Sequence, residues 1–444
     1  MTTVRRKGPK RAAEEVFKAA LSSASPYKAV KANLILSNKL RIAHLSLDLR
    51  SIKNIYVIGS GKAAPSMAKA AEDALGGLIK GGLIVTKYGH GLELKYIKSI
   101  EAGHPIPDRN GLMGAREILK TAKAAGRGDL IIFLLSGGAS ALLPAPVNAI
   151  SLGDKKRLTK LLINSGSPIQ EINAVRKHLS KIKGGRFMEA AYPARVITLI
   201  ISDVVGDDIS SIASGPTAPD PTTYTDCLKI IKKYGLMKKT PPNVTSFLKM
   251  GASGRIEETP KPGDRAFKYC DNIIIANNST ALKAAKGKAR SLGYRALILS
   301  SSITGPTIEA AKFFASFLKE VKRSGNPIRP PCCLLMGGET TLKVKGKGLG
   351  GRNEEFALAA ALELEGAEGI TVLSAGTDGT DGPTDAAGAF ADPSTVKRAE
   401  REGIDALKFL KENNSYNFFK KLNSLFITGP TGTNVMDIAI GIVD

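Results

Sequence analysis

The feature of this chain that most limits its fold is a repeated pair, a short β-branched apolar run followed by a turn of small residues. Ala- and Lys-rich stretches with the composition of helices separate these runs. Continuous apolar runs of this length are typical of parallel strands that are buried on both faces of a sheet. Strand, glycine turn and helix in repetition predict an α/β fold, in which ligands bind beyond the carboxyl ends of the strands. The runs cover residues 54–58, 82–86, 129–135, 195–201, 272–276, 296–299, 332–336 and 370–374.

The length of 444 residues predicts two or three domains, because a domain usually takes about 100–200 residues. The composition changes between residues 238 and 262, where Pro, Gly and charged residues surround one short helical stretch. Such a segment is typical of a linker. We therefore expect an N-terminal domain over residues 1–255 and a C-terminal domain over residues 256–444.

Lys and Arg outnumber Asp and Glu by 64 to 40, which gives a formal net charge of +24 and favours anionic partners. The basic residues are spread along the chain, only 5% of residues are aromatic and Trp is absent, so no stacking surface for nucleic-acid bases is expected. No apolar run is long enough to span a bilayer, and the basic N-terminus, residues 1–11, has no apolar stretch behind it. These features predict a soluble cytoplasmic protein without a membrane partner or a specific nucleic-acid partner.

The first glycine turn, VIGSGKAAP, leads from a predicted strand into a helix start whose free amides would suit an anion. It is not a Walker A loop, because Tyr56 stands at the position of that motif's first glycine and Ala63 at that of its Ser or Thr. It does match the dinucleotide pattern G-x-G-x-x-A, but the acidic residue expected at the end of the next strand is missing after Val85. Lys62 is the candidate anion-binding side chain here, and the alternative is a solvated lysine at a helix start.

Two further segments carry candidate phosphate or substrate contacts. The turn LLSGGAS places Ser136, Gly137 and Gly138 where backbone amides could approach a phosphate, although tight packing of a helix on the sheet would need the same small residues. The stretch NAVRKH offers Asn173 and Arg176 to an anionic substrate, although on charge alone a solvated helix face is the better interpretation.

Acidic residues follow two of the apolar runs. The segment SDVVGDD provides Asp203 and Asp207 as candidate Mg²⁺ ligands, because Mg²⁺ takes one or two carboxylates together with substrate phosphates. The alternative is a turn in which an Asp caps the next helix. The segment AGTDGTDGPTD provides Asp378 and Asp381, for which a base, a metal ligand and a plain turn all remain open.

The segment MGGETTLKVKGKGLGGRNEE joins a strand to an Ala-rich helix through a glycine-rich loop. So many glycines are unfavourable unless the backbone must bend sharply or approach a ligand. Arg352, at the predicted helix start, is a candidate phosphate clamp. The candidate nucleotide contacts of this segment are Gly337, Gly338, Glu339, Gly350 and Gly351.

These segments, in this order, resemble the type-2 glycerate kinases, the family with a C-terminal MOFRL domain. The resemblance extends from about Glu14 to the C-terminus. It rests on GSGKAAPSMAKAAE, GHPIPDRNG, LLSGGASALLPAP, INAVRKHLSKIKGGR, SDVVGDDISSIASGPTAPDPTT, TPKPGD, MGGETTLKVKGKGLGGRNEEFALAAAL and SAGTDGTDGPTDAAGA.

The resemblance implies a kinase that uses ATP and a divalent cation such as Mg²⁺ to phosphorylate D-glycerate, giving 2-phosphoglycerate and ADP. It also implies a larger Rossmann-like domain with a parallel sheet, a smaller MOFRL-type α/β domain, and an active site in the cleft between them. ATP and D-glycerate are then the expected partners, and a homodimer is compatible with the sequence.

The resemblance emphasises two residues, and the needs of phosphoryl transfer, which are positioning and charge neutralisation, suggest roles for them and for others. Lys62 and Arg352 fall on the positions that the family emphasises and would hold the transferring phosphoryl group and the glycerate carboxylate. The turn 136–138 and the loop 346–351 would cradle nucleotide phosphates. Asp203 or Asp207 would hold Mg²⁺, and Asp203 or Asp381 would accept the proton of the substrate hydroxyl.

Two other functions stay in view. One is a hydroxypyruvate reductase that uses NAD(P)H, a name the family has also carried, against which the missing acidic residue of the dinucleotide pattern argues. The other is a non-enzymatic RNA-binding protein, which would need a dense basic stripe with aromatic residues that the sequence lacks.

Overall fold

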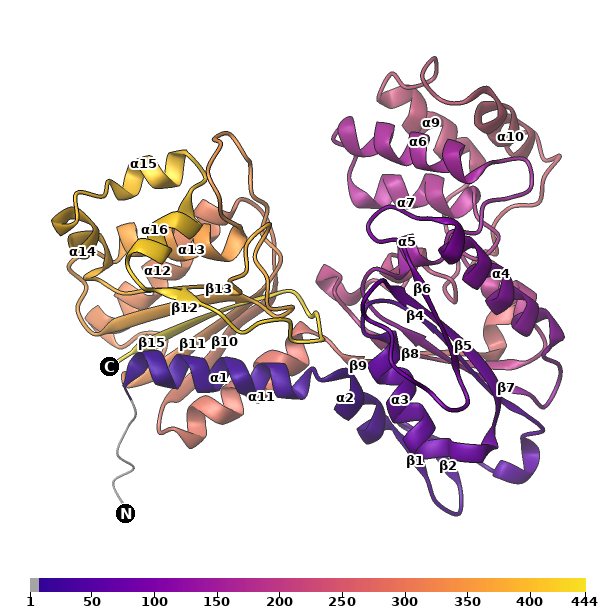
Figure 1. Cartoon of the computed structure of the whole chain (residues 1–444), viewed down its shortest axis with the longest axis horizontal. Helices are drawn as coiled ribbons and strands as arrows, with labels where there is room; N and C mark the ends of the chain where they lie inside the picture. The colour runs from indigo at the N-terminus through magenta and orange to yellow at the C-terminus, as the bar shows by residue number, and fades with distance from the viewer. Residues whose placement is uncertain (1–7) are drawn as a thin grey trace. The chain divides into compact units, whose positions relative to one another are not determined.

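The computed structural model describes residues 8–444, which form two compact units. The larger unit contains residues 26–202 and 207–275, and the smaller unit contains residues 8–25, 203–206 and 276–444 (Figure 1). The sequence places the division between residues 255 and 256, whereas the chain finally enters the smaller unit at residue 276. The N-terminal helix α1 (Pro9–Ser23) belongs to the smaller unit because it packs along α11 (Asn278–Ser291). Of the basic N-terminal segment, residues 1–7 lie outside the described residues.

The larger unit is built on a six-stranded sheet with the strand order β6-β5-β4-β7-β8-β9. Every pair from β6 to β8 is parallel, which confirms the parallel sheet predicted from the apolar runs. The sequence missed β6, because its largely polar residues, KSIEA, suit the exposed edge that it occupies. The strands are β4 (Ile55–Ser60), β5 (Ile79–Lys87), β6 (Lys98–Ala102), β7 (Leu130–Leu135), β8 (Arg195–Ile201) and β9 (Cys270–Ala276).

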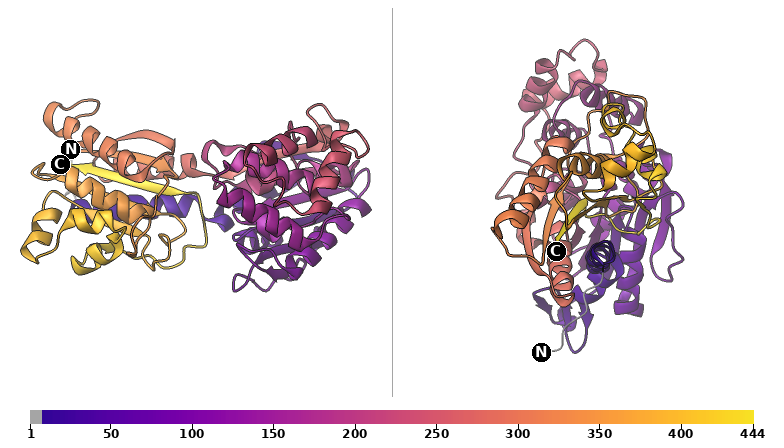
Figure 2. Two further views of the ribbon diagram at one scale, coloured as in Figure 1. Left: turned by 90° about the horizontal axis from the view of Figure 1, so that it is seen from above. Right: turned by 90° about the vertical axis from the view of Figure 1, so that its left-hand side faces the viewer.

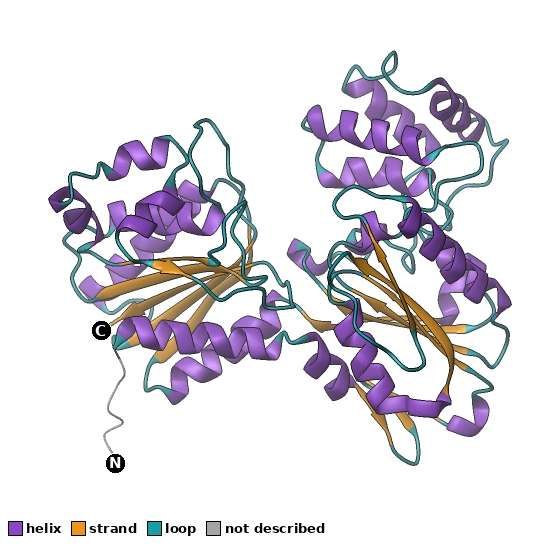
Figure 3. Ribbon diagram, in the orientation of Figure 1, coloured by secondary structure: helices purple, strands orange, loops and turns teal. Residues whose placement is uncertain are grey.

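Helices cover both faces of this sheet, because the crossover from β4 to β5 and the crossover from β6 to β7 run in opposite directions (Figure 3). The first crossover carries α3 (Ala64–Leu75) and the second carries α4 (Arg109–Ala124), which also packs on α8 (Arg186–Ala191). Near the chain start of this unit, α2 precedes a small antiparallel sheet. Their bounds are α2 (Pro26–Asn33), β1 (Leu34–Leu36), β2 (Leu40–Ile42) and β3 (Leu45–Leu47).

A cluster of helices beside the sheet has a core of its own, which includes Leu158, Val175, Tyr224 and Leu248. The segment expected to be a linker, residues 238–262, contributes to this core. Its helix buries Val244 and Leu248, and Gly251 packs directly under the Tyr224 ring. The helices of this cluster are α6 (Leu152–Asn164), α7 (Ile169–His178), α9 (Tyr224–Lys233) and α10 (Pro242–Ala252), while the short α5 (Ala139–Leu142) follows β7.

The smaller unit has a mixed six-stranded sheet with the order β10-β11-β15-β12-β13-β14. The sequence predicted β10, β11 and β12 but not β15, which lies between β11 and β12 and is antiparallel to both. Gly441 of β15 leaves room for α12 (Thr307–Ser324), because a Cβ atom there would lie 2.4 Å from the Leu318 side chain. The strands are β10 (Arg295–Ile303), β11 (Cys332–Gly338), β12 (Ile370–Gly376), β13 (Gly388–Ala391), β14 (Leu425–Phe426) and β15 (Asp437–Val443).

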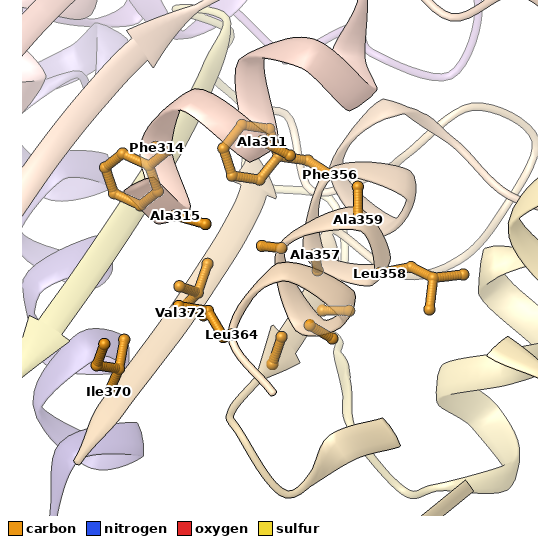
Figure 4. Packing of buried hydrophobic residues seen from close by; sticks show 14 of the residues in the cluster. Ala311, Phe314, Ala315, Phe356, Ala357, Leu358, Ala359, Leu364, Ile370 and Val372 are labelled. Carbon is orange, nitrogen blue, oxygen red and sulfur yellow. The ribbon is translucent and has the colours of Figure 1, made fainter. Parts of the chain in front are cut away.

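Two layers of helices enclose this sheet. On one face α1 lies against α11 and the C-terminal strand β15, as Figure 2 shows in indigo and yellow. On the other face Phe314 of α12 and Phe356 of α13 meet with ring centroids 5.9 Å apart, in a core that includes Val372 of β12 (Figure 4). The remaining bounds are α12 (Thr307–Ser324), α13 (Arg352–Glu363), α14 (Thr395–Arg401), α15 (Ala406–Lys411) and α16 (Ser415–Lys421).

Among the helices of residues 8–444, none combines the length and the apolar character that a membrane crossing requires.

Candidate functional site

The glycine turn after β4 uses its backbone amides inside the protein. The amides of Gly61, Lys62 and Ala63 donate to Val85 O (3.1 Å), Gly137 O (2.9 Å) and Ser136 Oγ (3.1 Å). The expectation of free amides in this turn is therefore wrong, because hydrogen bonds join the turn to β5 and to the neighbouring turn after β7. What this turn can offer to an anion is the side chain of Lys62, which has no hydrogen bond or ion pair among the described residues.

The turn after β7 is the one with free amides. Within the described chain, the amides of Gly137 and Gly138 donate no hydrogen bond. Gly138 has a φ of +89° and sits between two side chains, since a Cβ atom there would lie 3.0 Å from the His104 ring and 3.4 Å from Lys62 Cγ. Gly137, Gly138 and Lys62 thus lie together at the carboxyl ends of β4 and β7, as the sequence predicted for a phosphate-binding position.

Three partly or fully buried cations lie behind this turn, and carbonyl or amide oxygens are their acceptors. Lys155 Nζ donates to Leu179 O (3.2 Å), and Lys183 Nζ donates to Ser140 O (2.9 Å) and Ala213 O (3.2 Å). Arg176 donates to Ser140 O (3.3 Å) and weakly to Asn173 Oδ1 (3.5 Å). No carboxylate in the described part of the chain pairs with any of the three.

Burial without a counter-charge disfavours the charged form of these groups. Burial, and then the charge of Arg176, lowers the pKa of Lys155 to about 7. Burial, followed by Arg176 and Lys155, lowers the pKa of Lys183 well below its ordinary value, and burial lowers the pKa of Arg176. An anion that binds in this region would supply the negative charge that these buried cations lack.

Lys155 and Arg176 line a cavity of about 560 Å³, which we call the cationic pocket, whereas Lys183 is not part of its lining. Prolines and aliphatic side chains form its apolar wall, among them Pro105, Pro144 and Ile163, and the described residues contribute no carboxylate to its lining. The volume lies in the range of pockets for small-molecule and cofactor ligands. The polar lining consists of His104, Gly138, Ser140, Lys155, Lys156, Thr159, Lys160 and Arg176.

Of the two predicted substrate contacts on α7, Arg176 lines the cationic pocket and Asn173 does not. Asn173 is buried and accepts hydrogen bonds from Ser214 Oγ (3.2 Å) and Arg176, so it orients the arginine. Sequence reasoning missed Lys155 as a site residue, because DKKRLTK has the composition of a solvated helix face.

The smaller unit holds a second cavity, of about 260 Å³, which we call the acidic pocket. Five carboxylates and one guanidinium group line it, together with Thr380, Gly382, Asn434 and Met436. Asp203 and Asp378, predicted as site residues, both lie here. The charged lining residues are Asp203, Glu339, Arg352, Asp378, Asp381 and Asp437.

Arg352 is oriented in this pocket by two carboxylates. Its Nη1 donates to Glu339 Oε1 (2.6 Å), and its Nε and Nη2 donate to the two oxygens of Asp437 (3.1 and 3.4 Å). Burial on its own lowers the pKa of Arg352, but Asp437 and Glu339 outweigh it and raise the pKa. The guanidinium group is therefore firmly charged and fixed, with its side chain still about one-third exposed to a ligand.

Asp381, predicted as a candidate acid, is tied to the start of α13. Its Oδ2 accepts from the Glu354 amide (2.8 Å) and its Oδ1 from Asn353 Nδ2 (3.3 Å). Burial raises the pKa of Asp381, and burial followed by the nearby Asp381 charge raises the pKa of Glu354. Both oxygens of Asp381 thus have structural partners at the start of α13.

The glycine-rich loop before α13 is fastened to the protein rather than open. The amides of Lys345 and Gly346 donate to Asn413 Oδ1 (2.7 and 3.0 Å), and those of Gly348 and Leu349 donate to Glu412 O (2.9 Å) and Asn414 Oδ1 (3.1 Å). The close approach to residues 412–415 explains Gly346, Gly348 and Gly350.

The predicted nucleotide contacts of this segment are packed against protein atoms. A Cβ atom on Gly350 would lie 2.3 Å from Ser415 Oγ, and one on Gly351 would lie 2.2 Å from Asp381 Cγ. Cβ atoms on Gly337 and Gly338 would lie 1.9 Å from Asn278 Oδ1 and 2.2 Å from Ile303 O. Of this group, the side chain of Glu339 alone lines the acidic pocket.

The predicted Mg²⁺ ligands are divided between the units. Asp203 lines the acidic pocket, whereas Asp207 clusters with the larger unit and does not. Within residues 8–444, no three acidic, His or Cys side chains converge closely enough to hold a metal ion unaided. Mg²⁺ ordinarily takes one or two carboxylates and completes its shell with water and phosphate oxygens, so the donor set of the acidic pocket fits that ion.

Comparison with known proteins gives full-length matches. A domain of unknown function (DUF4147) matches residues 12–249, and the MOFRL family matches residues 332–437. The D-glycerate 2-kinase of Thermotoga maritima is 43% identical over 438 residues, 98% of each chain. A relative in Agrobacterium vitis, provisionally named hydroxypyruvate reductase, is 40% identical and covers 95% of this chain and 92% of its own. A crystal structure of glycerate kinase from Thermotoga maritima matches with a TM-score of 0.87 at 42% identity, covering 98% of this chain and 99% of that one.

Proposed function

The chain belongs to the glycerate 2-kinase family with a C-terminal MOFRL domain, and we propose that it transfers the terminal phosphoryl group of ATP to D-glycerate, giving 2-phosphoglycerate and ADP. The observation that carries this proposal is the cationic pocket, whose buried cations have no carboxylate partner. A polyphosphate is the anion that suits several convergent cations beside free backbone amides.

The larger unit supplies the nucleotide contacts in this proposal. The amides of Gly137 and Gly138, with Lys62 beside them, bind phosphate oxygens, and Arg176 and Lys155 bind the same polyphosphate from within the cationic pocket. The apolar wall formed by Pro105, Pro144 and Ile163 gives a surface on which a purine can be buried.

The smaller unit supplies the contacts to the cation and to the acid substrate. Arg352, held by Glu339 and Asp437, pairs with the glycerate carboxylate or the transferring phosphoryl group. Asp203 and Asp378 would hold Mg²⁺ together with phosphate oxygens. The bound ion would neutralise the charge of the phosphoryl group, which is most of what such a transfer requires.

In the transfer, the C2 hydroxyl oxygen of glycerate attacks the terminal phosphorus of ATP and the bond from that phosphorus to the β-phosphate oxygen breaks. Asp203 has two candidate roles, as a cation ligand and as the acceptor of the hydroxyl proton. Asp203→Asn separates them, because losing a ligand raises the Mg²⁺ concentration needed for half-maximal activity and losing a base does not.

Hydride transfer from NAD(P)H is the competing function, and the Agrobacterium vitis relative carries a reductase name. The turn 59–63 argues against it, because a dinucleotide pyrophosphate needs the amides that Gly61, Lys62 and Ala63 already use. In addition, β5 ends at Lys87 without an acidic residue for the ribose.

The test is ADP formation by the purified protein with ATP, Mg²⁺ and D-glycerate. Reactions without glycerate and with L-glycerate are the matched controls, and a parallel reaction contains NADH and hydroxypyruvate. We expect ADP formation that depends on D-glycerate. NADH consumption with hydroxypyruvate, in a preparation that forms no ADP with D-glycerate, would contradict the proposal.

A further inference from the structure

His104 lines the cationic pocket, and the proposed function gives it no role. It is half-buried, and neither ring nitrogen has a hydrogen-bond partner within the described part of the chain. The ring lies beside Gly138, since a Cβ atom placed on that glycine would be 3.0 Å from both Cδ2 and Nε2. His104 is thus an unsatisfied polar side chain next to the free amides of residues 137 and 138.

The backbone around His104 is fixed. His104 follows the end of β6, and Asp108 holds the turn by accepting from the Gly103 amide (3.0 Å) and the Gly111 amide (2.9 Å). Tyr88 in turn donates its hydroxyl to Asp108 (2.7 Å). The imidazole therefore projects from a braced turn, which is a requirement for a residue that orients a ligand.

Most polar side chains of the pocket are hydrogen-bond donors, because they are lysines and an arginine. Its two hydroxyl groups already have partners, since Ser140 Oγ is bonded to Ser214 Oγ (2.8 Å) and Thr159 Oγ1 donates to Lys155 O (2.8 Å). The imidazole of His104 is the side chain of this lining that can accept a hydrogen bond and has no partner among the described residues.

The surroundings keep this nitrogen unprotonated. Burial, followed by the charges of Lys62 and Lys87 and by His90, lowers the pKa of His104 to about 4. At neutral pH the imidazole is then neutral and has one donor and one acceptor nitrogen.

We propose that His104 is a substrate-orienting residue whose imidazole accepts a hydrogen bond from an O–H or N–H group of the ligand in the cationic pocket. The identity of that ligand rests on the proposed function, and two sources carry the required donor. One is the acid substrate with its hydroxyl groups, and the other is the nucleotide with its ribose hydroxyl groups and the exocyclic amine of its base. An acceptor at this position favours ligands that present an O–H or N–H group there, a preference that the cations cannot provide.

The direct test is nuclear magnetic resonance of ring-¹⁵N histidine in the whole protein. The chain contains four histidines, so the spectrum is simple, and His104→Gln assigns the signal. ATP alone, D-glycerate alone and sulfate alone are added in separate titrations. We expect either ATP or D-glycerate to shift the unprotonated ring nitrogen of His104 while the ring stays neutral, and the one that does so identifies the donor.

Sulfate is the control, because it is an anion without an O–H or N–H group. An equal shift with sulfate would show that His104 senses charge, and no shift with either substrate would show that it contacts neither. Each of these results would overturn the proposal. The titrations need no turnover, so they give a result even if the protein fails to phosphorylate D-glycerate.

Kinetics provide the second readout. His104→Leu removes the acceptor, and we expect it to raise KM about tenfold for the substrate that moves the resonance, as for the loss of one hydrogen bond. His104→Gln keeps an acceptor and should recover most of that loss. The matched control is His90→Leu, at an exposed histidine outside the pocket, which should leave both KM values unchanged. Equal KM values in His104→Leu and the wild type would contradict the proposal.

Discussion

At the scale of single residues, the position of Arg352 in the acidic pocket depends on the planar shape of its guanidinium group as much as on its charge. Three of its nitrogens are used by Glu339 and Asp437, and this planar set of bonds orients the group in the acidic pocket. A lysine has the same charge but has no planar set of N–H donors with which to make these three hydrogen bonds. The pocket therefore requires an arginine, which the sequence suggested from its place at a helix start.

Arg352→Lys should lower kcat by about 100-fold or more, because the remaining cation is misplaced for the developing charge. Arg323→Lys is the matched control, at an exposed arginine that pairs with Glu320 on α12, and it should leave kcat unchanged. The measurement is kcat and KM for both substrates, with folding checked by thermal melting. A kcat for Arg352→Lys within about twofold of the wild type would show that the positive charge alone is sufficient at this position.

Lys155 shows the opposite situation, a cation that is held without a counter-charge. Its folded-state pKa of about 7 lies below the ordinary value of 10.5, so at pH 8 it is largely neutral in the empty pocket. A bound polyphosphate favours the charged form and should raise the pKa again. Binding of the anion is then coupled to proton uptake.

Calorimetric titration with ATP at pH 8, in buffers of different ionisation enthalpy, measures that uptake. We expect net proton uptake in the wild type and a smaller uptake in Lys155→Met, with Lys183 supplying the rest. Lys160→Met removes an exposed charge of the same pocket and helix and should leave the uptake as it is. Identical uptake in Lys155→Met and the wild type would disprove the coupling.

Individual site residues differed in how well the sequence predicted them. Lys62 and Gly138 follow apolar runs, and the structure places them together. Arg176 comes from the charged stretch NAVRKH, which on charge alone favoured a solvated helix face, yet it lines the cationic pocket. Lys155 could not be recognised, because its burial arises from the cover of residues distant in sequence, such as Leu179. The roles expected for Asp203, Lys62 and Arg352 in catalysis stay predictions.

At the scale of elements, local patterns identified most of the buried apolar strands but missed β15, although its segment is also apolar. The segment DIAIGIV of β15 is central in its sheet through β11 and β12, more than 60 residues away along the chain. Similarly, glycines in the loops 59–61 and 346–351 were correctly seen as necessary. The sequence could not tell that protein atoms, rather than a ligand, approach them.

The turn after β7 offers a test of which glycine loop binds phosphate. Gly138→Ala would introduce strain at a φ of +89° and place a methyl group against His104 and Lys62. We expect the KM for ATP to rise about tenfold or more, because the amides shift from their positions. Gly89→Ala carries similar strain, at a φ of +76°, with nothing within 4 Å, and should leave that KM unchanged. Unchanged KM in Gly138→Ala would argue against a phosphate site here.

The start of α13 should make stability depend on pH. The raised pKa values of Asp381 and Glu354 mean that the folded state holds protons that the unfolded state has released, so stability falls as pH rises from about 4 through neutrality. Asp381→Asn keeps an acceptor for the Glu354 amide and removes the repulsion. We expect it to raise Tm at pH 8 and to change Tm little at pH 5.

Asp405→Asn is the control for this prediction, because it alters the cap of the exposed helix start of α15 without a buried partner carboxylate. Its effect on Tm should not grow between pH 5 and pH 8. If Asp381→Asn lowers Tm more at pH 8 than at pH 5, the carboxylate pair is stabilising and the prediction fails.

At the scale of the whole molecule, the net charge of +24 is an average over two pockets whose charged linings have opposite sign. The cationic pocket has no carboxylate in its described lining, while the acidic pocket has five carboxylates and one arginine. Net charge predicts an anion-binding protein. It could not predict that one unit concentrates acidic side chains, because composition carries no information about where folding brings residues together.

The position of phosphate on the product is the most direct test of the proposed reaction. After the purified protein has acted on D-glycerate with ATP and Mg²⁺, enolase alone is added and phosphoenolpyruvate is followed by its absorbance. Transfer to the C2 hydroxyl gives 2-phosphoglycerate, so phosphoenolpyruvate should form at once and in proportion to the ADP released. If phosphoenolpyruvate forms only after a phosphoglycerate mutase is added as well, the phosphate is on C3 and the proposed 2-kinase activity is contradicted.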